Sequence, residues 1–306
     1  MANEVKFPVT RGVRQGDMLS PLLFNAALEN VISKWKMCLH DHGIKLNDTH
    51  RLTNLRYADD LLLFGKSLAE VLEMLEILSA ELVGVGLSIN GSKTKILTTD
   101  LNASSSENPL YVDVAGSMVE ILRRGTVHKY LGKVFCGNLR NRGQCNLSHR
   151  MQCAWWKFHQ LRTTLENKNI PLKLRLKLFD AVVSPTILYS LSTTPLTSAQ
   201  VEKMDVTQRR MLRKIVGWIR FDDEDWEVTG RRMKARLEAG LRQYPIKTWS
   251  ERRANLVQKL LDKIANAPDD DLRKAAFNWN PSVIDEYFDG SHPYRAPGRP
   301  RQRWYE

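Results

Sequence analysis

The sequence has no long apolar run and no pattern of paired cysteines. Its apolar runs near the N-terminus, such as Leu61–Phe64, are far shorter than the roughly 20 residues that cross a bilayer, and no secretory pattern opens the chain. The four cysteines, Cys38, Cys136, Cys145 and Cys153, lack paired short spacings, which favours reduced thiols over a disulfide framework. We therefore expect a nuclear or cytoplasmic protein without a membrane segment.

Acidic residues are scarce in the second half of the chain. The 306 residues include 46 Lys and Arg against 34 Asp and Glu, which gives a net charge of +12. Residues 1–135 carry 15 basic and 15 acidic side chains, whereas residues 136–306 carry 31 and 19 and so hold the whole excess. The apolar fraction of 42% excludes disorder of the whole chain. A basic protein of this kind most often binds nucleic acid.

The spacing of apolar residues predicts an α+β chain whose second half is helical. In the first half we expect helices at 20–39 and 67–83, and strands at 55–57, 61–64, 87–97, 111–115, 118–122 and 128–135. Further helices are expected at 146–165, 171–191 with a kink at Pro185, 197–218 and 246–264. The acidic cluster Asp222–Asp225 is the candidate boundary before the last segment, and Pro293–Arg303 forms a Pro and Arg tail.

Two adjacent carboxylates, Asp59 and Asp60, lie between two short apolar strands. Adjacent residues of a regular strand point to opposite faces, so both can approach one site only where the chain turns. Two hard oxygen ligands at a tight turn suit Mg²⁺, which binds one or two carboxylates plus substrate phosphates. The alternative is a simple polar turn, which is the commoner meaning of the dipeptide by itself.

The neighbourhood of this pair resembles the reverse transcriptases of non-LTR (LINE-type) retrotransposons. The resemblance is carried, in order, by Arg11-Gly-Val-Arg-Gln-Gly-Asp17, Leu19-Ser-Pro-Leu-Leu-Phe24, Tyr57-Ala-Asp-Asp60, and Gly86-Leu-Ser-Ile-Asn90 with Lys93-Thr94. It implies a partial palm in residues 1–135, an antiparallel sheet with helices on one face that ends in a primer-grip hairpin at Lys129-Tyr-Leu-Gly-Lys133. It further implies a helical thumb-like region in 136–221 and a basic helical extension in 222–306.

The resemblance also implies an activity and its site residues. The activity is RNA-directed DNA polymerisation by two Mg²⁺ ions, with RNA and DNA as template and primer. Asp59 and Asp60 would be catalytic metal ligands, and Lys93 a candidate general acid for the pyrophosphate, although a solvated lysine beside a turn explains it equally well. The remaining expected contacts fall into two sets: for the nucleotide, Gln15, Gly16, Tyr57 and Ala58; for primer and nucleic acid, Tyr130, Leu131, Gly132, Arg209, Arg210, Arg213 and Lys214.

The four cations of the second set are also predicted without the resemblance. Arg209, Arg210, Arg213 and Lys214 fall within six residues of one expected helix, and a second basic cluster follows at 231–236. Such density neutralises phosphates along a nucleic-acid backbone. The alternative is a solvated helix face, but cations recur over several helices with few acidic residues between them.

The sequence departs from this family in one respect. The family's polymerases use a third carboxylate well upstream of the Gln-Gly motif, and only ten residues precede Arg11 here, of which Glu4 is the sole acid. We therefore expect a truncated polymerase fragment that is inactive alone, binds its metal ions weakly, and takes a nucleoside triphosphate only if the palm is completed. The alternatives are a non-catalytic module that binds RNA or an RNA–DNA hybrid, as in the spliceosomal core, and a non-functional relic.

Two weaker patterns lie on the helix expected after Cys145. Cys145, His149 and Cys153 recur every four residues and share a helix face, but no fourth ligand is evident, so helix packing is expected rather than a zinc site. Trp155 and Trp156 could stack on nucleic acid. A half-buried core pair is the expected role.

Overall fold

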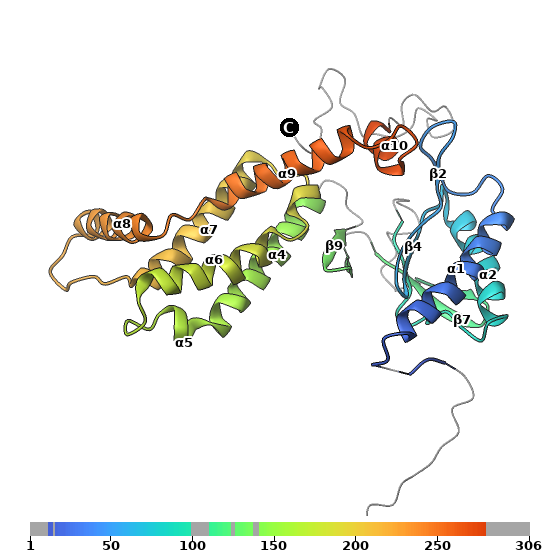
Figure 1. Cartoon of the computed structure of the whole chain (residues 1–306), viewed down its shortest axis with the longest axis horizontal. Coiled ribbons are helices and arrows are strands. Elements are labelled where there is room, and N and C mark those ends of the chain that lie inside the picture. Colours follow the sequence, from blue (N-terminus) through green and yellow to red (C-terminus); the bar gives the residue numbers. More distant parts are fainter. Residues whose placement is uncertain (1–11, 15, 99–109, 124–125, 137–140, 280–306) are drawn as a thin grey trace, which may run out of the picture. The chain divides into compact units, whose positions relative to one another are not determined.

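The computed structural model describes residues 12–14, 16–98, 110–123, 126–136 and 141–279 (Figure 1). They form two compact units. The first unit runs to Leu122 and resumes at Asp269, and the second unit runs from Arg123 to Pro268. Within the described residues the chain therefore passes between the units twice. Both helices and sheets are present, which confirms the α+β class.

The first unit contains three helices and seven short strands in its described part. The helices are α1 (Ser20–Cys38), α2 (Leu68–Val83) and α10 (Leu272–Asn278). The strands are β1 (Ile44–Lys45), β2 (Arg51–Leu52), β3 (Asn54–Tyr57), β4 (Asp60–Leu63), β5 (Lys95–Ile96), β6 (Leu110–Val114) and β7 (Ser117–Ile121). They form the pairs β1-β2 and β3-β4 and a three-stranded sheet in the order β5-β7-β6.

Helices α1 and α2 pack together around the core of the first unit. Trp35 of α1 is fully buried, and its indole Nε1 donates to the carbonyl oxygen of Met74 in α2 at 2.9 Å. Helix α2 begins as predicted, because the Ser67 side chain accepts from the backbone N–H of Glu70. The Glu70 carboxylate does not close a capping box on Ser67. It accepts instead from the backbone N–H groups of Gly43 at 2.8 Å and Lys66 at 2.5 Å, and so fixes α2 to the strand region.

The strand predictions hold for the hairpins and fail for residues 87–97. There only Lys95 and Ile96 pair, because residues 91–93 form a turn and the Asn90 carbonyl accepts from the N–H groups of Lys93 and Thr94. Strand β5 also runs parallel to β7, so the sheet is not wholly antiparallel. The antiparallel β6-β7 pair turns at Ala115 and Gly116, both at positive φ, as expected for a two-residue hairpin loop.

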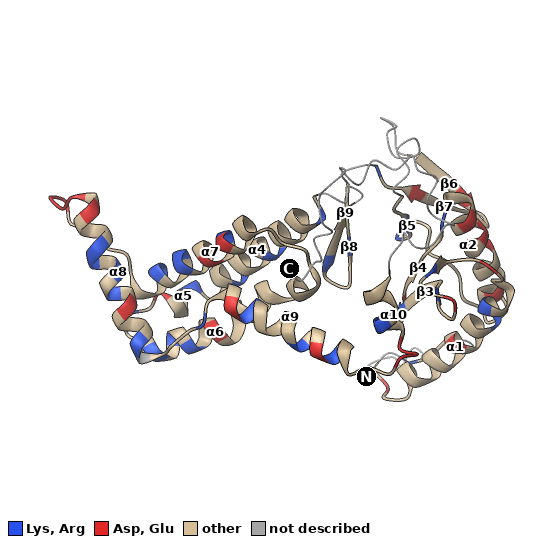
Figure 2. Ribbon diagram, turned by 90° about the horizontal axis from the view of Figure 1, so that it is seen from above, with Lys and Arg blue, Asp and Glu red and all other residues tan. Residues whose placement is uncertain are grey.

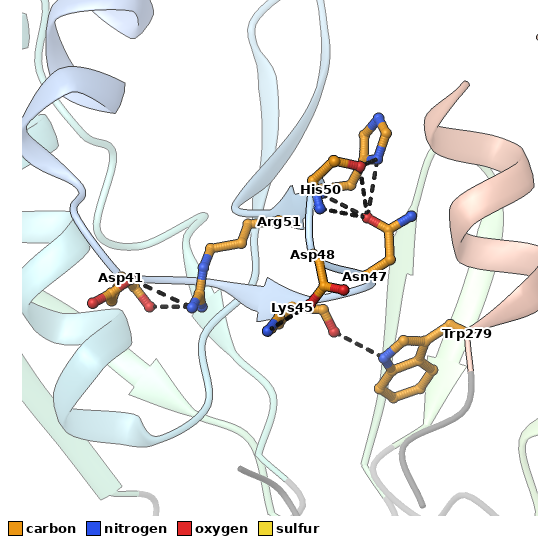
Figure 3. Close-up of polar contacts among 8 residues, drawn as sticks. Asp41, Lys45, Asn47, Asp48, His50, Arg51 and Trp279 are labelled. Carbon is orange, nitrogen blue, oxygen red and sulfur yellow. Dashed lines mark hydrogen bonds and ion pairs between the residues drawn. The ribbon is translucent and has the colours of Figure 1, made fainter. Parts of the chain in front are cut away.

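The C-terminal part of the first unit contacts the β1-β2 connection (Figure 3). The Trp279 indole Nε1 donates to the Lys45 carbonyl at 2.9 Å, and His50 Nε2 donates to the Asp270 carbonyl at 2.7 Å. The Asn47 side-chain oxygen holds this connection by accepting from the His50 N–H at 2.7 Å. A segment more than 200 residues away in sequence thereby becomes part of the first unit.

The second unit combines one hairpin with a helical bundle. Its elements are β8 (Val127–Tyr130), β9 (Lys133–Cys136), α4 (Arg142–Gln160), α5 (Arg162–Leu165), α6 (Leu172–Leu188), the short 3₁₀ helix η1 (Leu191–Thr193), α7 (Ser198–Val216), α8 (Trp226–Gln243) and α9 (Trp249–Ala265). The core is aromatic. Phe158, Phe179 and Trp249 are fully buried, the last two stack at 6.1 Å, and Trp249 Nε1 donates to Ser184 Oγ at 3.0 Å.

The predicted helices of the second unit are found, with different bounds. The helix expected at 146–165 begins at Arg142 and breaks at Leu161 into α4 and α5, and Pro185 lies in the last turn of α6 rather than at a central kink. Helix α8 was not predicted, because its buried side is made largely of small residues and offers only Met233 and Leu237 as buried large apolar side chains. The expected tail at 293–303 lies outside the described residues.

Candidate metal and nucleic-acid site

The hairpin of β3 and β4 places the carboxylate pair at an exposed tip. Tyr57 pairs with Asp60, so Ala58 and Asp59 form the two-residue turn and Asp60 begins β4. Ala58 has φ of +52°, a value that favours glycine at the first position of a type II′ turn. A non-glycine residue held there stores backbone strain, which is characteristic of functional sites. Tyr57, Ala58, Asp59 and Asp60 are all exposed.

The hairpin tip borders a cavity of about 580 Å³ in the first unit. The cavity combines the turn residues Ala58 and Asp59 with the loop before α1 and the first turns of that helix. Its lining residues are Val13, Arg14, Gly16, Asp17, Ser20, Pro21, Phe24, Asn25, Ala58 and Asp59. The structure thus brings Gly16 together with Ala58 and Asp59, although 42 residues separate Gly16 from Ala58. Gln15 lies outside the described residues.

The entry to α1 is fixed by the side chains of Asp17 and Ser20. The Asp17 carboxylate accepts from the Leu19 N–H at 2.9 Å, and the Ser20 hydroxyl donates to the Arg14 carbonyl at 2.5 Å. Leu19 is the N-cap of the helix, and Ser20 is its first residue. Gly16 has φ of +90°, and a Cβ there would meet nothing within 4 Å. Glycine is therefore favoured at this position by the positive φ and not by a lack of space for a side chain.

The donor set at the hairpin tip suits a hard divalent cation. Carboxylate oxygens are the ligands that Mg²⁺ prefers, and two of them at one turn leave the remaining positions to water and substrate phosphates. Asp59 and Asp60 can supply such a pair because the chain turns at Asp59. Within the described ranges, no group of three or more His, Cys, Asp or Glu side chains is arranged to hold a metal ion. By their chemistry, the two exposed carboxylates could supply part of a Mg²⁺ coordination shell and not the whole of one.

Lys93 is not among the residues that line the cavity. It lies in the turn before β5, exposed, and its backbone N–H donates to the Asn90 carbonyl and side-chain oxygens. Its role as a general acid stays a prediction.

The second expected contact region, the hairpin of β8 and β9, is held at its tip by a tyrosine. Leu131 and Gly132 both have positive φ, +47° and +76°, as in a type I′ turn. The Tyr189 hydroxyl donates to the Leu131 carbonyl at 2.6 Å, and a Cβ on Gly132 would come within 3.1 Å of the Tyr189 ring. The Arg150 guanidinium lies 5.1 Å from the centre of that ring. The hairpin tip is therefore fastened to the helices of the second unit.

A buried asparagine fastens the same hairpin closer to its base. The Asn146 side-chain oxygen accepts from the Val134 N–H at 3.2 Å, and its amide donates to Ser190 Oγ at 3.1 Å and Thr194 Oγ1 at 2.7 Å. Lys133 also fastens the hairpin, because its Nζ donates to Thr193 Oγ1 in η1 at 3.1 Å. Burial lowers the pKa of Lys133, and the nearby Arg142 lowers it further.

The predicted basic cluster lies on α7. Arg209, Arg210 and Lys214 are exposed, whereas the half-buried Arg213 places its guanidinium 5.4 Å from the centre of the Trp218 ring. Figure 2 shows Lys and Arg recurring along α7 and α8. Three of the four predicted cations are thus available to solvent and to a ligand.

The cysteine and tryptophan pattern on α4 is only partly as expected. Cys153 Sγ lies 3.6 Å from His149 Nε2, and burial raises the pKa of the Cys145 thiol, with a hydrogen bond to Cys136 adding to the shift. Trp155 packs against the core of the second unit, as expected. Trp156 is 61% exposed, with the Lys157 ammonium 5.2 Å from its ring centre, so the expectation of a core role was wrong for this residue.

Comparison with known proteins identifies a family over the first part of the chain. Residues 1–135 match the family described as reverse transcriptase (RNA-dependent DNA polymerase), the segment that contains the cavity and both carboxylates. These residues belong to the reverse transcriptase family. The relatives described next include Pol polyproteins of R2 elements and support a reverse transcriptase of a non-LTR retrotransposon.

The relatives are transposon proteins. The chain is 30% identical to a transposon-derived protein of Caenorhabditis elegans over 166 residues, 54% of this chain and 57% of that protein. It is 26% identical over 218 residues to the Pol polyprotein of the retrotransposable element R2 of Popillia japonica, 69% of this chain and 33% of the polyprotein. It is 30% identical over 147 residues to the R2 polyprotein of Drosophila melanogaster, 46% of this chain and 13% of the polyprotein. The matches thus span between an eighth and about half of these relatives. No helix in the described part of the chain is long and apolar enough to span a bilayer.

Proposed function

We propose that this chain is the part of an RNA-directed DNA polymerase that holds primer and template beside a divalent-metal site. On this proposal residues 1–135 are palm with a primer-grip hairpin, residues 136–221 are thumb-like, and residues 222–306 are a basic helical extension. The observation that carries it is the cavity of the first unit, where the strained hairpin tip Ala58-Asp59 and the positive-φ Gly16 meet. Both features fall in the segment that matches the reverse transcriptase family.

The residues of the first unit have distinct proposed tasks. Asp59 and Asp60 coordinate Mg²⁺, which when bound stabilises charge on the attacking and leaving oxygens of a phosphoryl transfer. Gln15, Gly16, Tyr57 and Ala58 border the incoming nucleotide, with Ala58 near the primer end. Lys93 supplies a proton to the leaving pyrophosphate if its exposed side chain reaches it.

The second unit supplies a surface for nucleic acid in this proposal. The hairpin tip Tyr130-Leu131-Gly132 contacts the primer, and its fastening by Tyr189 gives that contact a fixed position. Arg209 and Arg210 are exposed on α7 and neutralise backbone phosphates. Contacts of this kind carry no base information, so binding is expected to show little sequence preference.

We further propose that this chain binds nucleic acid without extending a primer. In the described residues the Asp59 and Asp60 pair has no third acidic residue that completes a metal-holding group. A misplacement of about 1 Å at a reacting centre costs on the order of 10²-fold in rate. Nucleotide addition would then require a further carboxylate in the site, and the chain by itself acts as a module that binds RNA or an RNA–DNA hybrid.

Fluorescence anisotropy with a labelled DNA primer on an RNA template tests this proposal. We expect binding that weakens steeply with salt and strengthens with Mg²⁺, and we expect Asp59→Asn with Asp60→Asn to remove the Mg²⁺ effect alone. Asp113→Asn, an exposed acid on β6, is the matched control and keeps the Mg²⁺ effect.

Two results would contradict the proposal. Absence of binding to the primer–template would remove its basis. Processive extension by the purified chain, measured with nucleoside triphosphates on the same substrate, would show that the site is complete.

A further inference from the structure

Three exposed cations lie around the C-terminal end of α7. Lys168 lies in the connection between α5 and α6, Lys214 in the last turn of α7, and Arg236 on α8. A Cβ built on Gly217 would lie 3.9 Å from Lys168 Cε and 4.0 Å from Arg236 Nη2. The Gly217 N–H donates to the Lys214 carbonyl at 3.2 Å, which places Lys214 at the same helix end. We call Lys168, Lys214 and Arg236 the cation cluster.

No carboxylate offsets the cation cluster within the part of the chain that the structure describes. None of its three members forms an ion pair there, and the acid nearest to Lys168 in sequence, Glu166, pairs with Arg162 at 2.9 Å. Behind the cluster, burial lowers the pKa of Arg175, and the charge of Arg236 lowers it further. Cations gathered without a counter-charge repel one another, so a bound anion would stabilise the arrangement.

An exposed tryptophan adjoins the cation cluster. Trp218 directly follows Gly217, is 40% exposed, and has the Arg213 guanidinium 5.4 Å from its ring centre. Arg213 Nε is buried and has no hydrogen-bond partner in the described residues. Proteins bind unpaired nucleic acid with aromatic rings beside cations, because the rings stack on the bases and the cations contact the phosphates.

A second exposed tryptophan nearby in sequence has the opposite surroundings. Trp226 is 62% exposed and lies under the Arg220 guanidinium at 4.3 Å. Its flanking residues Asp225 and Glu227 are exposed acids, which repel phosphate. Trp218 and Trp226 are both exposed, and each has the guanidinium of a different arginine over its ring. They differ in the sign of the charge on the neighbouring residues.

We propose that Trp218 and the cation cluster form a binding site for single-stranded nucleic acid, in which an unpaired base stacks on Trp218 and phosphates contact the three cations. The site rests on the proposed function, since it assumes that the chain holds nucleic acid. It adds a position for a strand that is not paired in the primer–template duplex.

Anisotropy of the full chain with a short oligouridine, the matching oligothymidine and a blunt RNA–DNA duplex of the same length tests the site. We expect Trp218→Ala to weaken binding of both single strands on the order of tenfold, and Trp218→Phe to retain most of it. Trp226→Ala is the matched control and leaves binding unchanged. Duplex binding is expected to change little in all three variants.

A salt titration isolates the phosphate contacts. Replacing Lys168, Lys214 and Arg236 by Ala is expected to lower the slope of log K against log salt for the oligouridine by about 2, since each single-strand contact contributes about 0.7. The control removes the same charge from exposed Lys203, Lys259 and Lys263, which lie outside both predicted basic clusters, and is expected to leave the slope nearly unchanged.

The outcomes separate this inference from the proposed function. Duplex binding without single-strand binding overturns the site alone, as does an equal loss in the Trp218→Ala and Trp226→Ala variants or in the two triple variants. A wild-type chain that binds neither single strand nor duplex overturns both proposals.

Discussion

The hairpins β3-β4 and β8-β9 have strands of the same length and two-residue turns, yet their tips have opposite surroundings. Each bends through two residues, and in each the first of these is a non-glycine residue at positive φ, Ala58 at +52° and Leu131 at +47°. The tip of β3-β4 is exposed beside a cavity. The Leu131 carbonyl at the tip of β8-β9 accepts a hydrogen bond from Tyr189.

This difference shows how one supersecondary motif can serve two tasks. A tip that borders a cavity and carries two carboxylates leaves coordination positions to a ligand. A tip fastened by neighbouring helices is a rigid contact element, because its position is set by groups on α4 and in the segment that follows α6. The comparison predicts that substitutions around β8-β9 cost stability, whereas a substitution at the tip of β3-β4 does not.

The largest effect is expected for Asn146→Ala. Asn146 is 1% exposed, and its loss leaves the N–H of Val134 and two hydroxyls without their buried partner. Unsatisfied buried groups cost about 1–3 kcal/mol each, so we expect the free energy of unfolding to fall by about 3 kcal/mol in urea titrations. Asn255→Ala, an exposed position on α9, is the control and should change it little. An equal effect of both would show that the hairpin is not held by Asn146.

The next largest loss of stability is expected for a glycine substitution at the tip of β8-β9, compared with one at the tip of β6-β7. Gly132→Ala combines a positive φ of +76° with a Cβ 3.1 Å from the Tyr189 ring, whereas Gly116→Ala has φ of +81° and open space. The strained backbone costs about 1 kcal/mol in each case, and the close contact adds about 1 kcal/mol at Gly132. Thermal unfolding should therefore separate the two variants by several degrees. Identical unfolding temperatures of the two variants would mean that the Tyr189 ring does not pack against the β8-β9 tip.

Removal of one hydroxyl is expected to have a smaller effect. Tyr189→Phe keeps the ring on Gly132 but loses the hydrogen bond to the Leu131 carbonyl. We expect a loss of about 1 kcal/mol and faster amide hydrogen exchange in residues 127–136. Tyr111→Phe, at an exposed position of β6, should alter neither quantity. Unchanged exchange in the Tyr189 variant would show that the hairpin is held by other groups.

The smallest expected effect has the opposite sign. Ala58→Gly relieves the strain at φ of +52° and should raise the free energy of unfolding by about 0.5 kcal/mol, net of the entropy that glycine adds to the unfolded chain. Ala26→Gly, in the exposed middle of α1, should lower it by about 1 kcal/mol. A destabilised Ala58→Gly variant would mean that the tip is not strained.

Local features of this chain could be predicted from its sequence, and distant contacts could not. The hairpin between Tyr57 and Leu61 and the start of α2 at Ser67 follow from patterns within ten residues, although the turn falls on Ala58 and Asp59 and not on the expected pair Asp59-Asp60. The pairing of Asn146 with Val134 and Thr194, by contrast, depends on how a hairpin meets two later segments. The cavity itself was not predicted. Of its described lining residues, only Gly16, Ala58 and Asp59 were among the expected site residues, because the other lining residues reach the cavity through the packing of α1.

Iron-directed cleavage tests the central claim most directly. Fe²⁺ replaces Mg²⁺ in the full chain, and peroxide with ascorbate then cuts the backbone close to the bound ion. We predict cuts near residues 57–61 and in the cavity-lining segment 13–25, which disappear in the Asp59→Asn, Asp60→Asn variant and persist in Asp113→Asn. Cuts confined to other segments, or unchanged by loss of the two carboxylates, would contradict a metal site at the β3-β4 tip.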